Sequence, residues 1–302
     1  MTGTDLTGGS NIAIERERPR EWSIGIYLGG SPLDMRDSAA VRNPVITRDD
    51  VTDRPARFVA DPFMLRDDGI WYMFFEVLDD ETNRGEIALA TSLNGLEWRY
   101  RGVVLSEPFH LSYPYVFTWE GAYYMVPESL KPNAARLYRA TNFPSAWEHV
   151  ADLIPGWCAD SSLVRHGGLW WIFTCPNPSG RDILRLYFAE ELTGPWREHP
   201  ASPIVEGNAA AGRPGGRVIE YDGGLIRYSQ DCSRIYGESV LAFEILALDC
   251  NRYVEREYAG NPVLAPTGSG WNGACMHTID PHPMDGGGWI ACVDGHFQGD
   301  EE

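Results

Sequence analysis

Two aspartates at matching places in the sequence could act together as catalytic carboxylates. Asp61 is the second residue of ADPFMLRDDGIWYMFFEV (60–77), and Asp160 is the second residue of ADSSLVRHGGLWWIFTCP (159–176). Each lies eight residues before a turn glycine, Gly69 or Gly168. A pair of carboxylates suits glycoside chemistry, because one can protonate the leaving oxygen while the other activates water or attacks the anomeric carbon. We therefore expect both aspartates to be catalytic; the alternative is that each caps a strand or a turn.

These two segments are copies of a repeat, and the repeat predicts the fold. A third copy, SYPYVFTWEGAYYMVPES (112–129), has Tyr113 where the others have aspartate, and fainter copies cover 213–231 and 276–294. Each copy reads as an apolar strand, a turn that ends in glycine and a second strand. The spacing of about 50 residues fits one four-stranded propeller blade. Five copies predict an all-β protein, a five-bladed β-propeller; a two-sheet sandwich would not produce a repeat.

The repeat also predicts the domain organisation. The fifth copy ends near the C-terminus, with too little chain left for its outer strands. The stretch WSIGIYLG (22–29) can supply a missing strand, so we expect the ring to be closed by this N-terminal strand. We expect one propeller domain over residues 20–296, with a polar tail at 1–19 and a short tail at 297–302.

The first strand of each blade lines the centre of a propeller, so the residues that open the copies should converge on a central pocket. Besides Asp61 and Asp160, this predicts Tyr113 and His277 at the pocket, together with Arg213 and Arg217 of the fourth copy. The arginines could bind an anionic group of the substrate, or each could form an ion pair with a carboxylate of a neighbouring blade.

Further candidates lie around these openings. Acidic residues follow the turn glycines by seven or eight positions, and among them Glu128 and Asp231 are the ones that we expect to bind substrate. Together with Glu76, Cys175 and Asp294, which occupy equivalent positions, they could form a second ring at the opposite rim, or be strand ends in solvent. We also expect substrate contacts from two residues outside this series, His110 and Trp271.

Composition excludes several other classes of function. The formal net charge of -18 argues against nucleic acid and against an anionic membrane surface. No apolar run is long enough to span a membrane, and the N-terminus lacks the apolar core of a signal peptide. Six cysteines without a CxxC pair favour free thiols and a cytoplasmic location. The sequence has no nucleotide-binding or zinc-hydrolase motif, so we expect no cofactor, although a structural Ca²⁺ or a water molecule in the central channel stays open.

The chain resembles the clan of five-bladed propellers that contains the family-43, family-32, family-68 and family-117 glycosidases. It is more closely similar to the N-terminal propeller domain of the plant glucosamine inositolphosphorylceramide transferases and to stand-alone bacterial relatives. The runs that carry this likeness cover about residues 20–296, and include WSIGIYLGGSP, FVADPFM, EPFHLSYPYVF, GRPGGRV and YSQDC.

The resemblance implies roles for three residues and exposes one departure. Asp61 matches the catalytic base of family 43, and Asp160 matches the second aspartate, which orients the acid. The glutamate that serves family 43 as its acid has no counterpart, because the fourth copy begins with Arg213-Pro214-Gly215-Gly216-Arg217. His277 could replace it, as a late histidine does in family 117, or could help to hold an ion, or could be structural.

We therefore expect a carbohydrate-active enzyme, similar to a glycoside hydrolase or transglycosidase, that acts on a glycan or a sugar-containing small molecule. Two alternatives remain at this point. One is a non-hydrolytic biosynthetic enzyme, cyclase-like or transferase-like, that has reused the pocket; the other is a glycan-binding module without catalysis.

Overall fold

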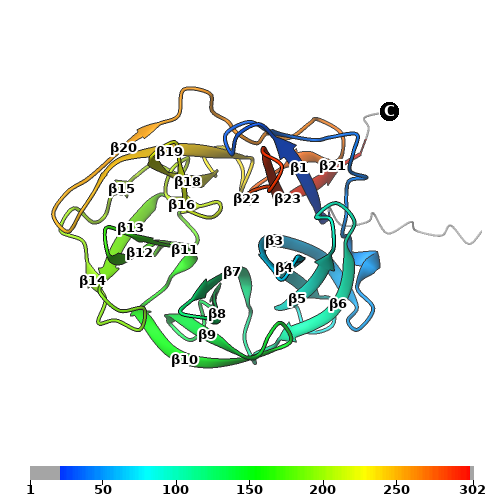
Figure 1. Cartoon of the computed structure of the whole chain (residues 1–302), viewed down its shortest axis with the longest axis horizontal. Coiled ribbons are helices and arrows are strands. Elements are labelled where there is room, and N and C mark those ends of the chain that lie inside the picture. Colours follow the sequence, from blue (N-terminus) through cyan, green and yellow to red (C-terminus); the bar gives the residue numbers. More distant parts are fainter. Residues whose placement is uncertain (1–20, 300–302) are drawn as a thin grey trace, which may run out of the picture.

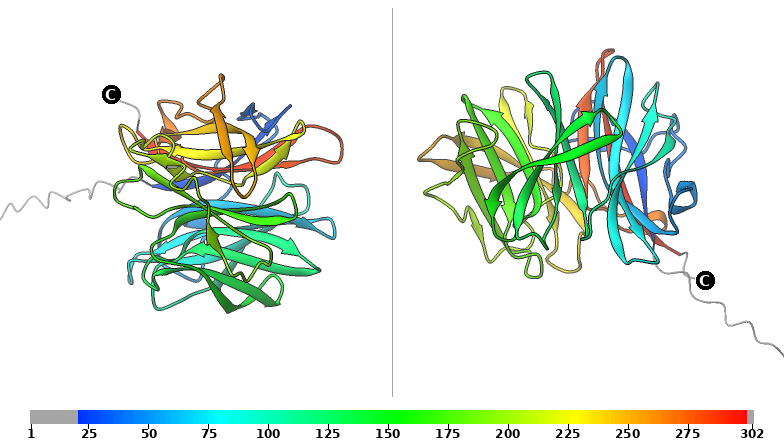
Figure 2. Two further views of the ribbon diagram at one scale, coloured as in Figure 1. Left: turned by 90° about the vertical axis from the view of Figure 1, so that its left-hand side faces the viewer. Right: turned by 90° about the horizontal axis from the view of Figure 1, so that it is seen from below.

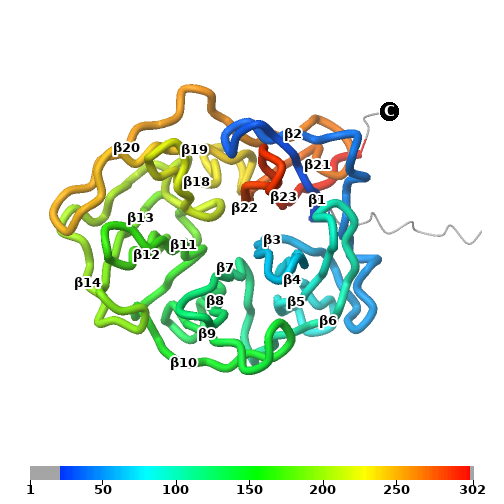
Figure 3. Tube along the Cα trace, viewed as in Figure 1, coloured from blue at the N-terminus to red at the C-terminus, as the bar shows by residue number. Residues whose placement is uncertain are grey.

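The computed structural model describes residues 21–299, which form a ring of five antiparallel sheets around a centre (Figure 1). Each sheet is one blade, and the chain runs once around the ring (Figure 3). The side views show that the strands run across the thickness of the ring (Figure 2). The all-β fold and the five blades predicted from the repeat are thereby confirmed.

Four blades follow the order of the sequence. Blade 1 contains β3 (Ala56–Asp67), β4 (Ile70–Asp79), β5 (Arg84–Ser92) and β6 (Arg99–Leu105). Blade 2 contains β7 (Ser112–Trp119), β8 (Ala122–Glu128), β9 (Ala134–Asn142) and β10 (Ala146–Pro155). Blade 3 contains β11 (Ala159–His166), β12 (Leu169–Cys175), β13 (Ile183–Ala189), β14 (Arg197–Glu198) and β15 (Val205–Glu206). Blade 4 contains β16 (Arg213–Pro214), β17 (Ile219–Tyr221), β18 (Gly224–Asp231), β19 (Ser239–Leu248) and β20 (Tyr253–Glu257).

Blade 5 joins the two ends of the domain. It contains β21 (Gly270–Cys275), β22 (Ile279–Pro283), β23 (Trp289–Gln298), β1 (Trp22–Gly29) and β2 (Met35–Arg36). Strand β1 pairs with β23 from Trp22 opposite His296 to Gly29 opposite Trp289, so the N-terminal strand closes the ring as expected. Strand β23 continues two residues beyond 296, where the sequence suggested a tail. The predicted tail at 1–19 lies outside the described residues.

Among residues 21–299 the single helix is the short 3-10 turn η1 (Arg48–Asp50). This part of the chain accordingly holds no helix that could cross a lipid bilayer. All six cysteines are free thiols.

Apolar side chains fill the spaces between neighbouring blades. Trp170 and Trp171 are adjacent on β12 and point to opposite faces, as successive strand residues do. Trp170 packs against Phe117 of blade 2, with ring centroids 5.5 Å apart. Trp171 belongs to the cluster shared with Leu225 of blade 4. These contacts hold the blades together, so the two tryptophans serve the core.

Arg217 ties four blades together by its hydrogen bonds. Its Nε and Nη2 donate to the buried Asp280 of blade 5 at 2.6 and 3.2 Å. Nη2 also donates to the carbonyl oxygens of Met64 in blade 1 (3.3 Å) and Val116 in blade 2 (2.9 Å). Burial opposes ionisation of Asp280, but Arg217 and His282 hold its pKa at about 2. Arg217 thus forms the inter-blade ion pair that the sequence left open as an alternative to substrate binding.

Candidate functional site

The first strands of blades 1, 2 and 3 share an unusual backbone at one position. Asp61, Tyr113 and Asp160 have φ angles of 53°, 46° and 49°, in the left-handed region. In each blade the pairing of the first two strands shifts at this residue, which forms a bulge. A left-handed backbone is rare and costly outside glycine, and strained bulges concentrate at functional sites. The three residues are therefore structural equivalents, as the repeat predicted.

The acidic residues that end the second strands lie beside these bulges. The N–H of Asp61 donates to Asp294 Oδ2 at 3.0 Å, and the N–H of Asp160 donates to Glu128 Oε2 at 3.1 Å. Glu76 pairs with the residue that precedes Asp61. An antiparallel hairpin returns the end of its second strand to the start of its first. The expectation of an opposite rim, or of strand ends in solvent, is therefore wrong for Glu76, Glu128 and Asp294.

Five buried carboxylates thus meet at the centre, and we call Asp61, Glu76, Glu128, Asp160 and Asp294 the central acidic cluster. None is more than 6% exposed. Burial raises the pKa of Asp61 to about 6, although the charge of His277 counteracts the effect. Burial and the neighbouring carboxylates raise the pKa values of Glu76 and Glu128 well above their usual range. Asp61, Glu76 and Glu128 therefore hold protons at pH values where exposed carboxylates would lose them.

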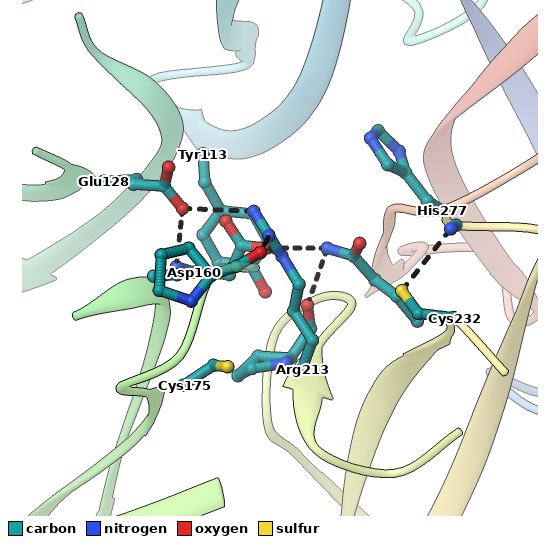
Figure 4. Close-up of polar contacts among 12 residues, drawn as sticks. Tyr113, Glu128, Asp160, Cys175, Arg213, Cys232 and His277 are labelled. Atoms are coloured by element: carbon teal, nitrogen blue, oxygen red, sulfur yellow. Dashed lines mark hydrogen bonds and ion pairs between the residues drawn. The ribbon is translucent and has the colours of Figure 1, made fainter. Parts of the chain in front are cut away.

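Arg213 is the cation that Asp160 and Glu128 share (Figure 4). Its Nε donates to Asp160 Oδ2 at 2.5 Å, and its Nη2 donates to Glu128 Oε2 at 3.2 Å. Gln230 Nε2 donates to the same oxygen of Asp160 at 2.6 Å. The other oxygen, Asp160 Oδ1, is buried and accepts no hydrogen bond. Arg213 therefore also forms ion pairs with neighbouring blades. It lies at the start of the fourth blade, the position at which the sequence has no counterpart of the family-43 acid.

His277 connects Asp294 to Asp61. Its Nδ1 lies 2.7 Å from Asp294 Oδ2, and its Nε2 lies 3.7 Å from Asp61 Oδ1. Burial alone would lower the pKa of His277, but Asp294 outweighs it and the pKa is raised. Because Asp294 fixes the proton on Nδ1, the second proton of the charged ring is on Nε2 and faces Asp61.

Two aromatic rings enclose His277. The ring of Trp22 stacks on the imidazole at 4.0 Å, with an angle of 18° between the planes. The ring of Tyr236, from the loop between β18 and β19, meets the imidazole edge-on at 5.3 Å. Stacked aromatic faces stabilise a cationic ring and exclude water from it.

Asp61, His277 and Asp294 each offer a ligand atom within 4.8 Å of the others, a spacing that a metal ion could use. Asp294, however, already accepts four hydrogen bonds. Oδ1 accepts from the N–H groups of His277 and Thr278, and Oδ2 accepts from Asp61 N–H and His277 Nδ1. A carboxylate has about four acceptor positions. The arrangement therefore fits a hydrogen-bonded acid–base group better than an ion site.

The structure brings together five of the predicted site residues: Asp61, Glu128, Asp160, Arg213 and His277. Two more lie next to them. The buried Tyr113 hydroxyl contacts Ser162 Oγ at 2.9 Å and donates to the carbonyl oxygen of Gly216 at 3.2 Å. His110 is partly exposed, and its Nε2 lies 3.2 Å from Glu76 Oε1.

The remaining three lie elsewhere, and their contact with substrate stays a prediction. Arg217 forms an ion pair with the buried Asp280. Asp231 is half-buried and accepts from the Ser233 hydroxyl at 2.6 Å. Trp271 is half-buried and packs over Gly25 and Gly295 of blade 5.

Sequence reasoning missed Gln230, Trp22 and Tyr236. Gln230 follows Gly223 by seven residues, the interval that separates Glu76 from Gly69, so a stricter register would have selected it over Asp231. Trp22 and Tyr236 come from outside the repeat positions, and nothing in the repeat pointed to them.

The family model described as "Glucosamine inositolphosphorylceramide transferase 1, N-terminal" matches residues 15–296. Glucosamine inositolphosphorylceramide transferase 1 from Oryza sativa subsp. japonica is 39% identical to this chain over 295 residues. The match covers 91% of this chain and 40% of the relative. The chain therefore spans well under half the length of this curated relative.

Solved structures support the fold. A thermostable family-43 glycoside hydrolase superposes with a TM-score of 0.60 at 16% identity, covering 85% of this chain and 91% of that one. The family-117 glycoside hydrolase Zg3597 of Zobellia galactanivorans has a TM-score of 0.55 at 15% identity, covering 78% of this chain and 84% of that one. The expected likeness to these propellers is confirmed at the level of fold.

Gly237 in the loop over His277 provides a test of this geometry. A Cβ at Gly237 would lie 2.6 Å from His277 Cβ, whereas a Cβ at Gly223 would meet nothing within 4 Å. Both glycines have left-handed φ angles, 61° and 75°, so alanine costs roughly 1–2 kcal/mol of backbone strain at either position. We expect Gly237→Ala, but not Gly223→Ala, to shift the imidazole resonances of His277 in NMR spectra. Unchanged His277 resonances in both variants would contradict the placement of this loop.

Stability should depend on pH through Asp61. Its pKa is raised from 3.8 to about 6, so between these values the folded state holds a proton that the unfolded state has lost. This contribution to stability is present at low pH and disappears as pH rises through about 6. In Asp61→Asn we expect the free energy of unfolding, relative to the unmodified protein, to increase as pH rises across this window.

Denaturant unfolding at several pH values measures this difference, and Asp285→Asn is the control because that side chain is 82% exposed. A difference for Asp61→Asn that stays constant with pH would show that Asp61 is not a proton-holding group.

Proposed function

Because the chain belongs to the family of the N-terminal region of glucosamine inositolphosphorylceramide transferase 1, we propose that it is a carbohydrate-active domain that uses Asp61 and His277 as an acid–base pair. The observation that carries this proposal is the line of groups from Asp294 through His277 to Asp61. The separation of 3.7 Å between His277 Nε2 and Asp61 Oδ1 is longer than a hydrogen bond, so the proton on Nε2 is not committed to Asp61.

The two groups suit the two proton transfers of glycoside cleavage or transfer. Asp61, when ionised, accepts the proton of the attacking water or sugar hydroxyl. His277, when charged, donates its Nε2 proton to the departing glycosidic oxygen. Asp294 stabilises the imidazolium before the transfer, and Trp22 excludes water from its face.

Asp160 and Glu128 contribute charge and hydrogen-bond acceptors. Arg213 and Gln230 hold Asp160 through Oδ2, which leaves Oδ1 free to accept a sugar hydroxyl. A carboxylate fixed in this way can also stabilise positive charge that develops on a sugar ring in the transition state.

Arg213 favours a second candidate function. A guanidinium keeps its proton at any ordinary pH, so Arg213 cannot serve as the fourth-blade acid of family 43. A non-hydrolytic biosynthetic reaction or simple glycan binding would not require that acid. In either case the same cluster holds the sugar.

Turnover of a panel of oligosaccharides and synthetic glycosides, followed by mass spectrometry, separates these functions. We expect Asp61→Asn and His277→Gln to lower turnover by about 10²–10⁴-fold, because each removes one proton-transfer group. The rate should decrease as the pH falls below about 6, because Asp61 becomes protonated. It should also decrease at alkaline pH, because His277 loses its proton.

The exposed Asp285→Asn should keep full activity. If Asp61→Asn keeps a turnover within about tenfold of that of the unmodified protein, Asp61 takes no part in the proton transfer. Binding of a sugar without any product would favour the binding module.

A further inference from the structure

Gln230 occupies in blade 4 the position that glutamates occupy in blades 1 and 2. It pairs with the residue that opens its blade, as Glu76 and Glu128 do in theirs. Its side chain is completely buried. A side-chain amide is neutral at any ordinary pH and carries both donors and an acceptor. Blade 4 therefore places a neutral hydrogen-bonding group among the carboxylates of the central acidic cluster.

Two acceptors fix the orientation of the Gln230 amide. Its Nε2 donates to Asp160 Oδ2 at 2.6 Å and to the carbonyl oxygen of Pro214 at 2.9 Å. The carbonyl oxygen can only accept, and the Asp160 carboxylate is paired with Arg213. Turning the amide over would bring Oε1 against both acceptors, so the two ends of the amide cannot exchange. Gln230 Oε1 therefore needs a donor from another group.

In the described part of the chain, Gln230 Oε1 is buried and accepts no hydrogen bond. The equivalent side chain of blade 5, Asp294, accepts the backbone N–H of Asp61 from the next blade. For Gln230 the next blade holds the N–H groups of His277 and Thr278. Both of these donate to Asp294 Oδ1, at 3.1 and 2.9 Å, so neither is left for Oε1. A buried acceptor normally has a partner, which here has to come from outside these residues.

A second open acceptor belongs to the carboxylate that Gln230 contacts. Asp160 Oδ1 is also buried and accepts no hydrogen bond from residues 21–299. The two open oxygens therefore belong to one hydrogen-bonded pair of side chains. The missing donors need no positive charge, because Gln230 is neutral and Arg213 is already the cationic partner of Asp160. Hydroxyl groups on a sugar ring are neutral donors of this kind.

We propose that Gln230 is a specificity-determining residue, whose Oε1 accepts a hydrogen bond from one hydroxyl group of the bound sugar. This inference rests on the proposed function, because it assigns a further residue to the same site. Nε2 of the amide holds Asp160, and Oε1 at its other end recognises the ligand. A sugar that lacks this hydroxyl leaves the buried oxygen unpaired and therefore binds more weakly.

Deoxy sugars test the proposal. Isothermal calorimetry measures the affinities of the unmodified protein and of Gln230→Met for glucose, galactose and mannose. The hexose that binds most tightly is then compared with its derivatives that each lack one hydroxyl. In the unmodified protein we expect the loss of one particular hydroxyl to weaken binding by about tenfold or more, because Oε1 is left unpaired. In Gln230→Met the loss of the same hydroxyl should change the affinity by less than about twofold.

This comparison separates contact with the ligand from a structural role. Gln230→Met also removes the hydrogen bond to Asp160, which would lower the affinity for every sugar by the same factor and leave the ratios between sugars unchanged. A change in the ratio for one hydroxyl therefore reports a direct contact. Gln298→Met makes the same chemical change on an exposed residue and should leave all affinities unchanged.

A second measurement needs no change at Gln230 and decides the question if Gln230→Met does not fold. The chain has two glutamines, Gln230 and Gln298, so ¹⁵N labelling of glutamine side chains gives two amide signals in NMR spectra, which Gln298→Met assigns. A hydrogen bond to Oε1 polarises the amide and shifts its nitrogen resonance. We expect the Gln230 signal to shift when the parent hexose binds, and to shift much less with the derivative that lacks the recognised hydroxyl.

If the affinity ratios are the same in the unmodified protein and in Gln230→Met for every hydroxyl, the inference is wrong, but the proposed function stands because the sugar still binds. A Gln230 signal that no bound hexose shifts would show that an ordered water molecule satisfies Oε1 throughout, and would also overturn the inference. Binding of none of the hexoses would contradict the proposed function itself, and the inference with it.

Discussion

The ion pair between Arg213 and Asp160 is the interaction on which the centre of this protein depends. Removing a carboxylate from water costs several kcal/mol unless a partner replaces the lost hydration. Arg213 supplies that partner to Asp160 and Glu128 together, from a different blade. Without it, blades 2 and 3 would place two buried carboxylates without a cationic partner beside each other. Two acidic side chains can therefore be buried here because the fourth blade contributes the positive charge of Arg213.

The other buried carboxylates of the cluster also need partners that replace their lost hydration, and the partners differ from blade to blade. Asp294 is satisfied by four donors, which include His277. Asp61 accepts from Thr278 Oγ1 at 2.9 Å and retains a proton easily. Glu76 has the weakest compensation of the five. The blades are similar in backbone and different in charge, so equivalent positions of the repeat have different side-chain partners.

The sequence predicted the fold well because a propeller is periodic and its period is visible. Asp61, Tyr113 and Asp160 could be aligned by their distance from a turn glycine, and the structure gives them one backbone conformation. The side-chain partners were harder to predict. Whether Arg213 and Arg217 face a ligand or a neighbouring blade depends on distances across the ring, which the spacing along the chain does not determine.

Two other errors had simple physical causes. The acids that end the second strands were expected either at the opposite rim or in solvent, because hairpin geometry was not applied to them. Trp22 and Tyr236 were missed because a closing strand and a loop brought them to His277 from outside the repeat.

A crystal structure with a bound saccharide tests the central claim most directly. The account predicts a sugar oxygen within hydrogen-bond distance of both the Asp61 carboxylate and His277 Nε2, with Trp22 against the ligand or the imidazole. It would be contradicted by a saccharide bound only elsewhere, for example in the outer cleft lined by Tyr72, Leu89 and Pro144, with the central acidic cluster unchanged.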